Sequence, residues 1–288
     1  MKNIYFDNAA TTKLDDEVLK EMLPYLKDNY GNPSSIYKLG REARKAIEDS
    51  REKIAKVLNC KANEIYFTAG GSESDNTAIK GIAKANKKRG NHIITSKIEH
   101  PAVLETCKQL EKEGFEITYI SVDEKGIVDL EELKKSIKPT TILITIMFAN
   151  NEIGIIQPIE EIGKIAKGNN IYFHTDSVQA VGSIKIDVQK LNIDSLSLSG
   201  HKFYGPKGVG ALYVKTGVPF EKFISGGHQE RNKRAGTENV AGIVGIGKAI
   251  ELAYENLDEY NKKIKELRDY YVKQVEEKIP YIKINGDM

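Results

Sequence analysis

The segment TILITIMF at residues 141–148 decides the fold, together with IEEIGKIAK at 159–167 and IYFHT at 171–175. The first and third segments are short apolar runs rich in β-branched residues, as buried strands are. The second places apolar residues three and four apart, as on one face of a helix. A strand, a helix and a second strand in succession are typical of a parallel βαβ unit.

The same alternation continues on both sides of this unit. Further strands are predicted at residues 65–68, 92–95, 116–122, 195–199 and 210–214, and further helices at 101–112 and 130–137. The pattern predicts an α/β fold with a mostly parallel seven-stranded sheet between two layers of helices. In such sheets ligands bind beyond the carboxyl ends of the strands, so functional side chains are expected in the loops that follow strands.

The pattern changes after Gly236. Residues from about 238 to 279 read as long helix, interrupted near 256–258, and residues 281–284 suggest the beginning of one more strand. A lone strand needs partners. We therefore expect an N-terminal segment at 1–14, a large domain at 15–257, and the start of a truncated, incomplete small C-terminal domain at 258–288.

Composition excludes several classes of protein. The 288 residues are 40% hydrophobic and 29% charged, and 43 basic against 41 acidic residues give a net charge of +2. This balance provides no electrostatic footprint for nucleic acid or an anionic membrane. The N-terminus lacks the apolar core of a secretory signal, and no apolar stretch is long enough to span a bilayer. With two cysteines and no zinc-binding spacing, we expect a cytoplasmic protein without a metal.

Four loops that follow predicted strands carry polar groups unsuited to a core. The first is TAGGSESDN at residues 68–76, which leads into a helix expected from about Asn76. Paired glycines and a helix N-terminus together suit a phosphate group. The same residues also suit a simple glycine turn with a Ser or Asp cap, and the loop alone does not separate the two interpretations.

The other three loops add further chemistry. In EHP at 99–101, His100 taken alone is most simply a structural polar residue. In HTDSVQ at 174–179, Asp176 is suited to pair with a buried cation or to cap a helix. In SGHKFYGPKG at 199–208, Lys202 follows an apolar strand, where burial would make its amine nucleophilic toward an aldehyde, whereas Lys207 reads as a surface residue. A phosphate cradle, a ring to stack, an acid and such a lysine together describe a pyridoxal phosphate site.

At this point the motifs match a known family. They are YFDNAATT at 5–12, GNPSS at 31–35, GGSESDN at 70–76, NNEIG at 150–154, SGHK at 199–202 and RAGT at 234–237. The chain resembles the cysteine desulfurases of the NifS/IscS type, class V aminotransferases within the aspartate-aminotransferase-like fold (fold type I). The resemblance covers essentially the whole chain in consistent order.

The resemblance implies roles for individual residues. Lys202 would bond to the aldehyde of pyridoxal 5'-phosphate, Asp176 would pair with the pyridine nitrogen, and Gln179 would donate to the phenolic oxygen. His100 would stack on the ring and assist proton transfer, and Asn151 would lie near the substrate. The residues implied to hold the phosphate are Gly71, Ser72, Ser199 and His201, with Thr237 reaching the phosphate of a neighbouring subunit in a homodimer.

The resemblance also implies a reaction. L-cysteine would be converted to L-alanine, and a protein thiolate would take the sulfur as a persulfide and pass it to an acceptor or iron–sulfur scaffold protein. Cys60 and Cys107 do not match the family's catalytic cysteine motif, and both are predicted to be structural. The arginine that binds the substrate carboxylate is not recognised either, so we expect this chain to be inactive alone or dependent on a partner. A non-catalytic dimerising or docking paralogue and a related lyase or transaminase remain the alternatives.

Overall fold

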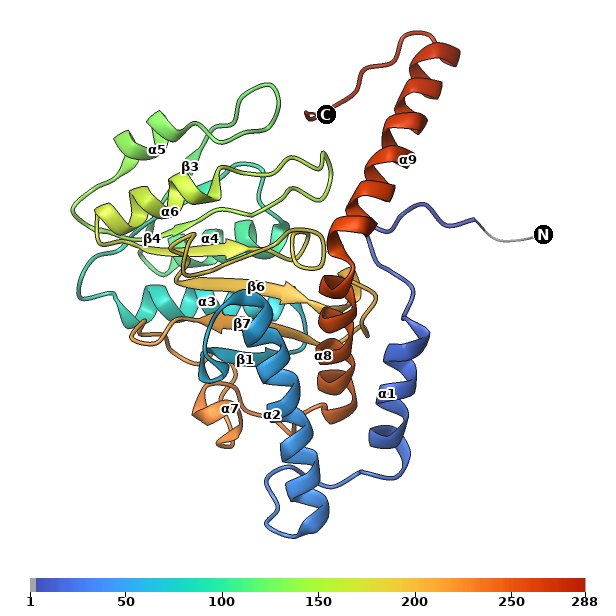
Figure 1. Ribbon diagram of the computed structural model, residues 1–288. Helices are drawn as coiled ribbons and strands as arrows, with labels where there is room; N and C mark the ends of the chain where they lie inside the picture. Colours follow the sequence, from blue (N-terminus) through green and yellow to red (C-terminus); the bar gives the residue numbers. More distant parts are fainter. Residues whose placement is uncertain (1–3, 288) are drawn as a thin grey trace.

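The computed structural model describes residues 4–287, and a single seven-stranded sheet forms its centre (Figure 1). The spatial order of the strands is β1-β7-β6-β5-β4-β2-β3, and β7 alone runs antiparallel to its neighbours β1 and β6. The predicted mostly parallel sheet is therefore confirmed. The strands are β1 (Ile65–Thr68), β2 (His92–Ser96), β3 (Glu116–Ile120), β4 (Thr141–Thr145), β5 (Tyr172–Asp176), β6 (Ser195–Ser199) and β7 (Gly210–Val214).

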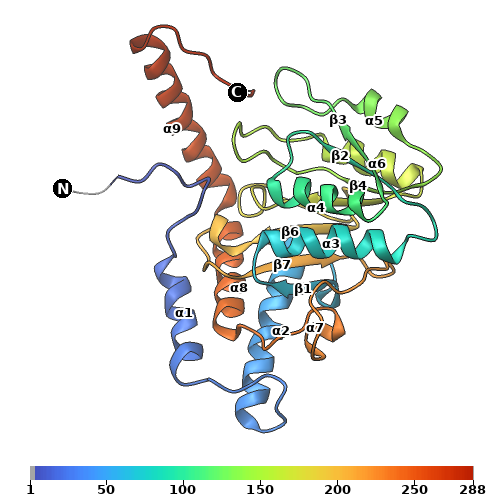
Figure 2. The ribbon, with the colours of Figure 1, turned by 180° about the vertical axis from the view of Figure 1, so that it is seen from behind.

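Both faces of the sheet are covered by helices because both faces are apolar. Successive residues of a strand point to opposite faces. Accordingly Ile93 packs into the apolar cluster beneath α3 (Gly71–Ala85) and α4 (Pro101–Lys112), whereas Ile94 packs into the cluster on the other face. Figure 2 shows α3 and α4 lying across their face. The opposite face carries α2 (Lys38–Leu58), α5 (Leu130–Ser136), α6 (Ile159–Gly168) and α8 (Val240–Glu255).

Helices outside these layers flank one end of the molecule. The first, α1 (Asp16–Lys27), packs against α8, and α8 is followed after Asn256 by α9 (Leu257–Lys278). The predicted interruption near 256–258 is thus present. Figure 1 shows α9 extending away from the sheet, with only Leu257 of that helix buried. Three short helical segments complete the secondary structure: η1 (Ala62–Glu64), η2 (Gly200–Lys202) and α7 (Gln229–Asn232).

Four predicted extents were wrong by more than one residue, the smallest difference being the strand predicted at 116–122, which ends at Ile120. Helix α3 begins at Gly71 rather than near Asn76, because the paired glycines form its first turn and Ser74 N donates to Gly70 O at 3.1 Å. The strand predicted at 141–148 ends at Thr145, where its pairing with β2 stops. The described chain has no strand at 281–284, where the side chains are exposed and no neighbouring strand is available.

No helix of the described chain has both the length and the apolar character needed to cross a membrane. The division of the chain at residue 257 remains a prediction. For the site, the important feature of the fold is that β1, β2, β4, β5 and β6 all end at one edge of the sheet.

Candidate active site at the carboxyl edge of the sheet

A cavity of about 250 Å³ lies at this edge and gathers most of the predicted site residues. They come from the ends of five strands, β1, β2, β4, β5 and β6, as expected for strands that finish at one edge. Nine of the ten predicted cofactor-binding residues line the cavity: Gly71, Ser72, His100, Asn151, Asp176, Gln179, Ser199, His201 and Lys202. The tenth, Thr237, lines a separate cavity of about 130 Å³ between β1 and the loop before α8. Its expected role in a neighbouring subunit therefore stays a prediction.

Lys202 occupies the last position of η2, directly after β6. Burial lowers the pKa of its amine, while the carboxylates of Asp176 and Asp7 act in the opposite direction. Its Nζ donates hydrogen bonds to Ala10 O at 3.1 Å and to Ala9 O. The nitrogen is therefore held by backbone carbonyls, and no salt bridge fixes it among the described residues.

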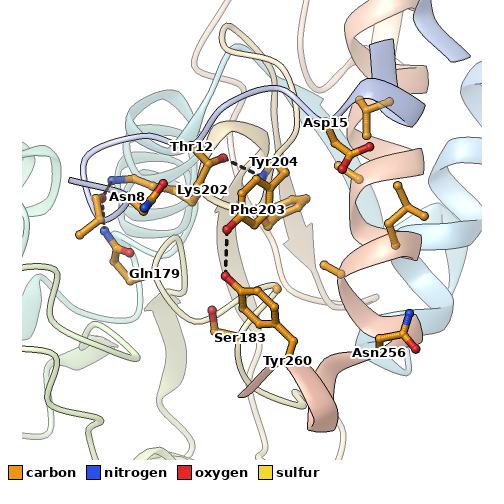
Figure 3. Close-up of a pocket in the computed structure, with 16 residues that line it drawn as sticks. Asn8, Thr12, Asp15, Gln179, Ser183, Lys202, Phe203, Tyr204, Asn256 and Tyr260 are labelled. Carbon is orange, nitrogen blue, oxygen red and sulfur yellow. Dashed lines mark hydrogen bonds between the residues drawn. The ribbon is translucent and has the colours of Figure 1, made fainter. Parts of the chain in front are cut away.

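The carbonyls that hold Lys202 belong to residues 7–12, here called the N-terminal strap. Thr12 fixes the strap, because its Oγ1 donates to His201 O at 2.9 Å and accepts from Tyr204 N at 2.7 Å. Gln179 Nε2 donates to Ala9 O at 2.8 Å. Figure 3 shows Thr12, Tyr204, Gln179 and Lys202 around a second cavity of about 340 Å³, which extends toward α8 and α9.

Asp176 and His100 form the floor of the first cavity. Asp176 ends β5, and its Oδ1 accepts a hydrogen bond from Val178 N at 2.9 Å. Burial raises the pKa of this carboxyl, while the nearby His100 and Lys202 lower it. His100 caps α4, with Nδ1 accepting from Ala102 N at 3.1 Å. That bond leaves Nε2 to carry the proton of the neutral ring, which is the nitrogen available for proton exchange.

The opposite end of the cavity is built to receive an anion. Gly71 starts α3, so the first N–H groups of this helix have no partner within it. Gly70 has a φ of +154°, and a Cβ on Gly71 would lie 2.6 Å from Val178 Cγ2, so both positions require glycine. The residues that also line an adjoining open cavity of about 470 Å³ are Gly71, Ser72, Ser199 and His201. These are the four residues implied to hold the phosphate.

The turn before α3 is tied to a distant loop. Glu73 Oε2 accepts from Ala69 N at 2.9 Å, and the same carboxylate binds Arg234 Nε at 2.8 Å and Nη2 at 3.2 Å. Arg234 lies in the loop that precedes α8. It follows Glu73 by 161 positions in the chain. The ion pair therefore fixes the glycine turn from outside the cavity.

Sequence reasoning missed several residues that line the cavity: Ala10, Asp75, Met147, Ala149 and Val178. Asp75 is the most informative of them, because it is a fully enclosed acid four residues after Gly71. Residues four apart share one face of a helix. The signal was thus present, but it depended on starting α3 at Gly71.

The two cysteines lie away from the cavity. Cys107 is completely buried on α4, and Cys60 is partly buried after α2. Burial raises the pKa of each thiol to about 12. Both thiols are therefore protonated at neutral pH, whereas a nucleophilic cysteine acts as the thiolate.

The geometry fits the pyridoxal phosphate group: a nucleophilic amine, a buried acid, an imidazole and an anion cradle converge on one cavity. The family model described as aminotransferase class-V matches residues 4–288. The chain therefore belongs to the class V aminotransferases.

Particular relatives narrow this class. The chain is 59% identical over 285 residues to the cysteine desulfurase IscS of Clostridium botulinum, covering 99% of this chain and 72% of that protein. It is also 59% identical to the IscS of Methanosarcina thermophila, covering 99% and 70%. Among solved structures, a NifS-like protein superposes with a TM-score of 0.93 at 47% identity, covering 94% of this chain and 75% of that one. A structure titled "SspA in complex with cysteine" gives a TM-score of 0.84 at 44% identity, covering 92% and 78%.

Proposed function

We propose that this protein is a pyridoxal-phosphate-dependent cysteine desulfurase that binds its cofactor in the 250 Å³ cavity. The observation that carries the proposal is the convergence of Lys202, Asp176 and the Gly71–Ser72 turn on that one cavity, in a chain similar to cysteine desulfurases. Lys202 would hold the aldehyde, Asp176 the pyridine nitrogen, and Gln179 the phenolic oxygen. When bound, the cofactor supplies an electron sink for bonds at the substrate α-carbon.

The protein's own residues prepare the site for this chemistry. Burial favours the free-base form of the Lys202 amine, which is the form that attacks a carbonyl carbon. Asp176 receives stabilisation of its charge from His100 and Lys202 and from the Val178 N–H. His100 Nε2 can give or take a proton inside the cavity because Nδ1 is held by Ala102 N. Phosphate binding by the α3 N-terminus would fix the cofactor's orientation.

The substrate we propose is L-cysteine, which is supported by the names of the similar proteins. Desulfuration needs a thiolate to accept the sulfur. Cys60 and Cys107 do not provide it in this structure, because both thiols have raised pKa values and neither lines the cavity. We therefore propose that this chain by itself yields little sulfide from L-cysteine, and that a partner thiol restores sulfur transfer.

Three finer points belong to the same proposal. Thr237 lies outside the cavity formed by its own chain, which supports a homodimer in which it reaches a neighbouring site. The sulfur would pass to an acceptor such as an iron–sulfur scaffold protein, and the location would be the cytoplasm.

The cofactor claim is tested by titrating the protein with pyridoxal phosphate and recording visible absorbance before and after borohydride reduction. The wild type should acquire a visible band and, after reduction, one covalently attached cofactor per chain. Lys202→Ala should acquire no attached cofactor, whereas the matched control Lys207→Ala, at an exposed lysine five residues later, should still acquire one attached cofactor per chain. Attachment that survives Lys202→Ala would contradict the proposal.

The desulfurase claim is tested separately, by adding L-cysteine to protein whose cysteines are in the thiol form and which has not been treated with borohydride. Alanine and sulfide should form when a small thiol is added as acceptor and should be scarce without it. Pyruvate and ammonia in place of alanine would indicate a lyase instead. A protein that binds the cofactor and converts no amino acid under either condition would contradict desulfurase activity while leaving cofactor binding intact.

A further inference from the structure

Asp75 is a carboxyl group at the cavity, and none of the roles proposed above for cofactor binding involves it. It lies on the second turn of α3, has an exposed fraction of 1%, and lines the cavity beside His100 and Asp176. Its Oδ1 has no hydrogen-bond partner among the described residues. One polar atom from each of Asp75, His100 and Asp176 lies within 4.8 Å of the others. Asp75 and Asp176 are therefore two enclosed acids at the same place.

Two carboxylates this close in a water-excluded site do not both ionise, because each charge opposes the other and neither is well solvated. Burial first, and then the charge of Asp176, raise the pKa of Asp75 well above its ordinary range. The pKa of Asp176 is raised as well, by burial. Both shifts favour the retention of one proton by the pair.

The surroundings decide which carboxyl keeps this proton. Asp176 accepts the N–H of Val178 and faces the side chains of His100 and Lys202, which all favour its ionised form. Asp75 faces Asp176 and His174 of β5, Ser197 of β6 and the buried Glu99. Of these, the Ser197 hydroxyl favours an ionised Asp75, whereas both acids oppose it.

His174 does not supply the missing positive charge. Its Nε2 lies 3.7 Å from Asp75 Oδ1, but burial lowers the pKa of the ring to about 3, so the ring is neutral. Its two nitrogens are also within hydrogen-bond distance of other groups, Nδ1 at 2.9 Å from Thr145 Oγ1 and Nε2 at 3.1 Å from Ser197 Oγ. Apart from the Ser197 hydroxyl, the burial of Asp75 and the acids around it therefore favour its neutral form.

We propose that Asp75 is a positioning residue: it keeps the proton that the two acids share and directs its O–H toward Asp176, which then faces the pyridine nitrogen as a carboxylate. The inference rests on the proposed binding of pyridoxal phosphate. A neutral donor behind Asp176 orients this carboxylate without cancelling its charge. Asp75 acts through Asp176, and no contact between Asp75 and substrate is required.

The proton on Asp75 is tested first in the cofactor-free protein, by infrared difference spectroscopy at neutral pH. Subtracting the spectrum of Asp75→Asn from that of the wild type should leave the carbonyl stretch of a protonated carboxylic acid. Thr95→Val replaces another enclosed side chain without a hydrogen-bond partner and should leave no such band. A difference spectrum that contains only carboxylate bands would overturn the proposal.

The positioning role is tested by cofactor titration of two variants. Asp75→Asn still offers an uncharged N–H donor and should keep the wild-type affinity to within about threefold, with an unshifted visible band. Asp75→Leu lacks a donor and should bind pyridoxal phosphate about tenfold more weakly, the effect of losing a hydrogen bond to a charged group. Asp176→Asn, which removes the carboxylate itself, should shift the band.

The outcomes are separable. If Asp75→Asn behaves like Asp176→Asn, Asp75 acts through a negative charge and the proposal fails. If Asp75→Leu matches the wild type, Asp75 has no positioning role and the proposal also fails. Should Asp75→Leu not fold, the infrared band and the Asp75→Asn titration decide. A wild-type protein that binds no cofactor would instead contradict the proposed function, while the infrared result would still report on the shared proton.

Discussion

Glu99 is a buried carboxyl group next to His100, and its protonation should shape how stability depends on pH. Its Oε1 accepts hydrogen bonds from Ser96 Oγ at 2.6 Å and from Met147 N at 3.0 Å, which ties the end of β2 to the end of β4. Burial raises the pKa of Glu99 to about 8. The folded state therefore favours the protonated acid. Its contribution to the free energy of unfolding is complete below the ordinary glutamate pKa of about 4.5 and is lost as the pH rises to about 8.

Glu99→Gln replaces this acid with an amide that does not titrate. Relative to the variant, the wild type should lose about 1.4 kcal/mol of unfolding free energy for each pH unit between about pH 5 and about pH 8. Urea unfolding of the cofactor-free protein across this range measures the difference. Thr95→Val, a buried change without a titrating group on the strand that precedes Glu99, should differ from the wild type by a constant amount. A constant difference for Glu99→Gln too would contradict the assigned protonation.

At the scale of the residue, the sequence predicted those site residues whose chemistry can be recognised from their own local sequence. Lys202 and Asp176 each follow an apolar strand, and both line the cavity. Asp75 was missed because the helix was expected to start near Asn76, so the spacing of four residues between Gly71 and Asp75 was not read as one helical face. Its meaning depends on Asp176, which is about a hundred positions away in the chain and becomes its neighbour only when β5 packs beside α3.

At the scale of elements, the N-terminus of α3 depends on the ion pair between Glu73 and Arg234. Both side chains are mostly shielded, with exposed fractions of 12% and 22%. The pair holds the turn that carries Gly70 and Gly71, because Glu73 also accepts the N–H of Ala69. Loosening it should disturb the anion cradle more than the rest of the cavity.

Arg234→Gln should therefore weaken binding of pyridoxal phosphate by about tenfold, as expected for the loss of charge-assisted hydrogen bonds. Pyridoxal, which lacks the phosphate, should bind the variant and the wild type equally. Parallel absorbance titrations with the two ligands measure this. Lys134→Gln, which breaks an exposed pair with Glu131 on α5, should change neither affinity. Equal losses for both ligands would show that Arg234 supports the whole cavity instead of the cradle.

The elements themselves were predictable where the local pattern is strong. Strands β1, β6 and β7 have the predicted bounds, as does α4, which begins with proline after His100. The ends of other elements were set by neighbours: β4 stops where β2 no longer pairs with it. Residues 281–284 have the composition of a strand, but the described chain offers them no partner.

At the scale of the whole molecule, a buried ion pair joins the N-terminal and C-terminal halves of the chain. Arg51 on α2 donates to both carboxylate oxygens of Glu230, at 2.8 and 2.9 Å, and each side chain has an exposed fraction of 3%. Glu230 also accepts from Phe67 N of β1 at 2.9 Å, and Arg51 donates to Ile65 O at 2.6 Å. Glu230 adopts left-handed backbone angles (φ 45°, ψ 46°) at this point, which the pair stabilises.

Breaking this pair from one side should be far more costly than removing both partners. Glu230→Gln removes the buried counter-charge of Arg51 and leaves only the half-exposed Glu48, whose Oε2 lies 3.1 Å from Arg51 Nε, so the unfolding free energy should fall by about 3–5 kcal/mol. The double variant Arg51→Met, Glu230→Gln should recover part of that loss, because the uncompensated charge is gone. On the same helix, Lys45→Gln breaks an exposed pair with Asp49 and should cost less than about 1 kcal/mol. Urea unfolding of these proteins and of the single variant Arg51→Met provides the comparison. Additive losses in the double variant would contradict the view that the two side chains act as one unit across the halves of the fold.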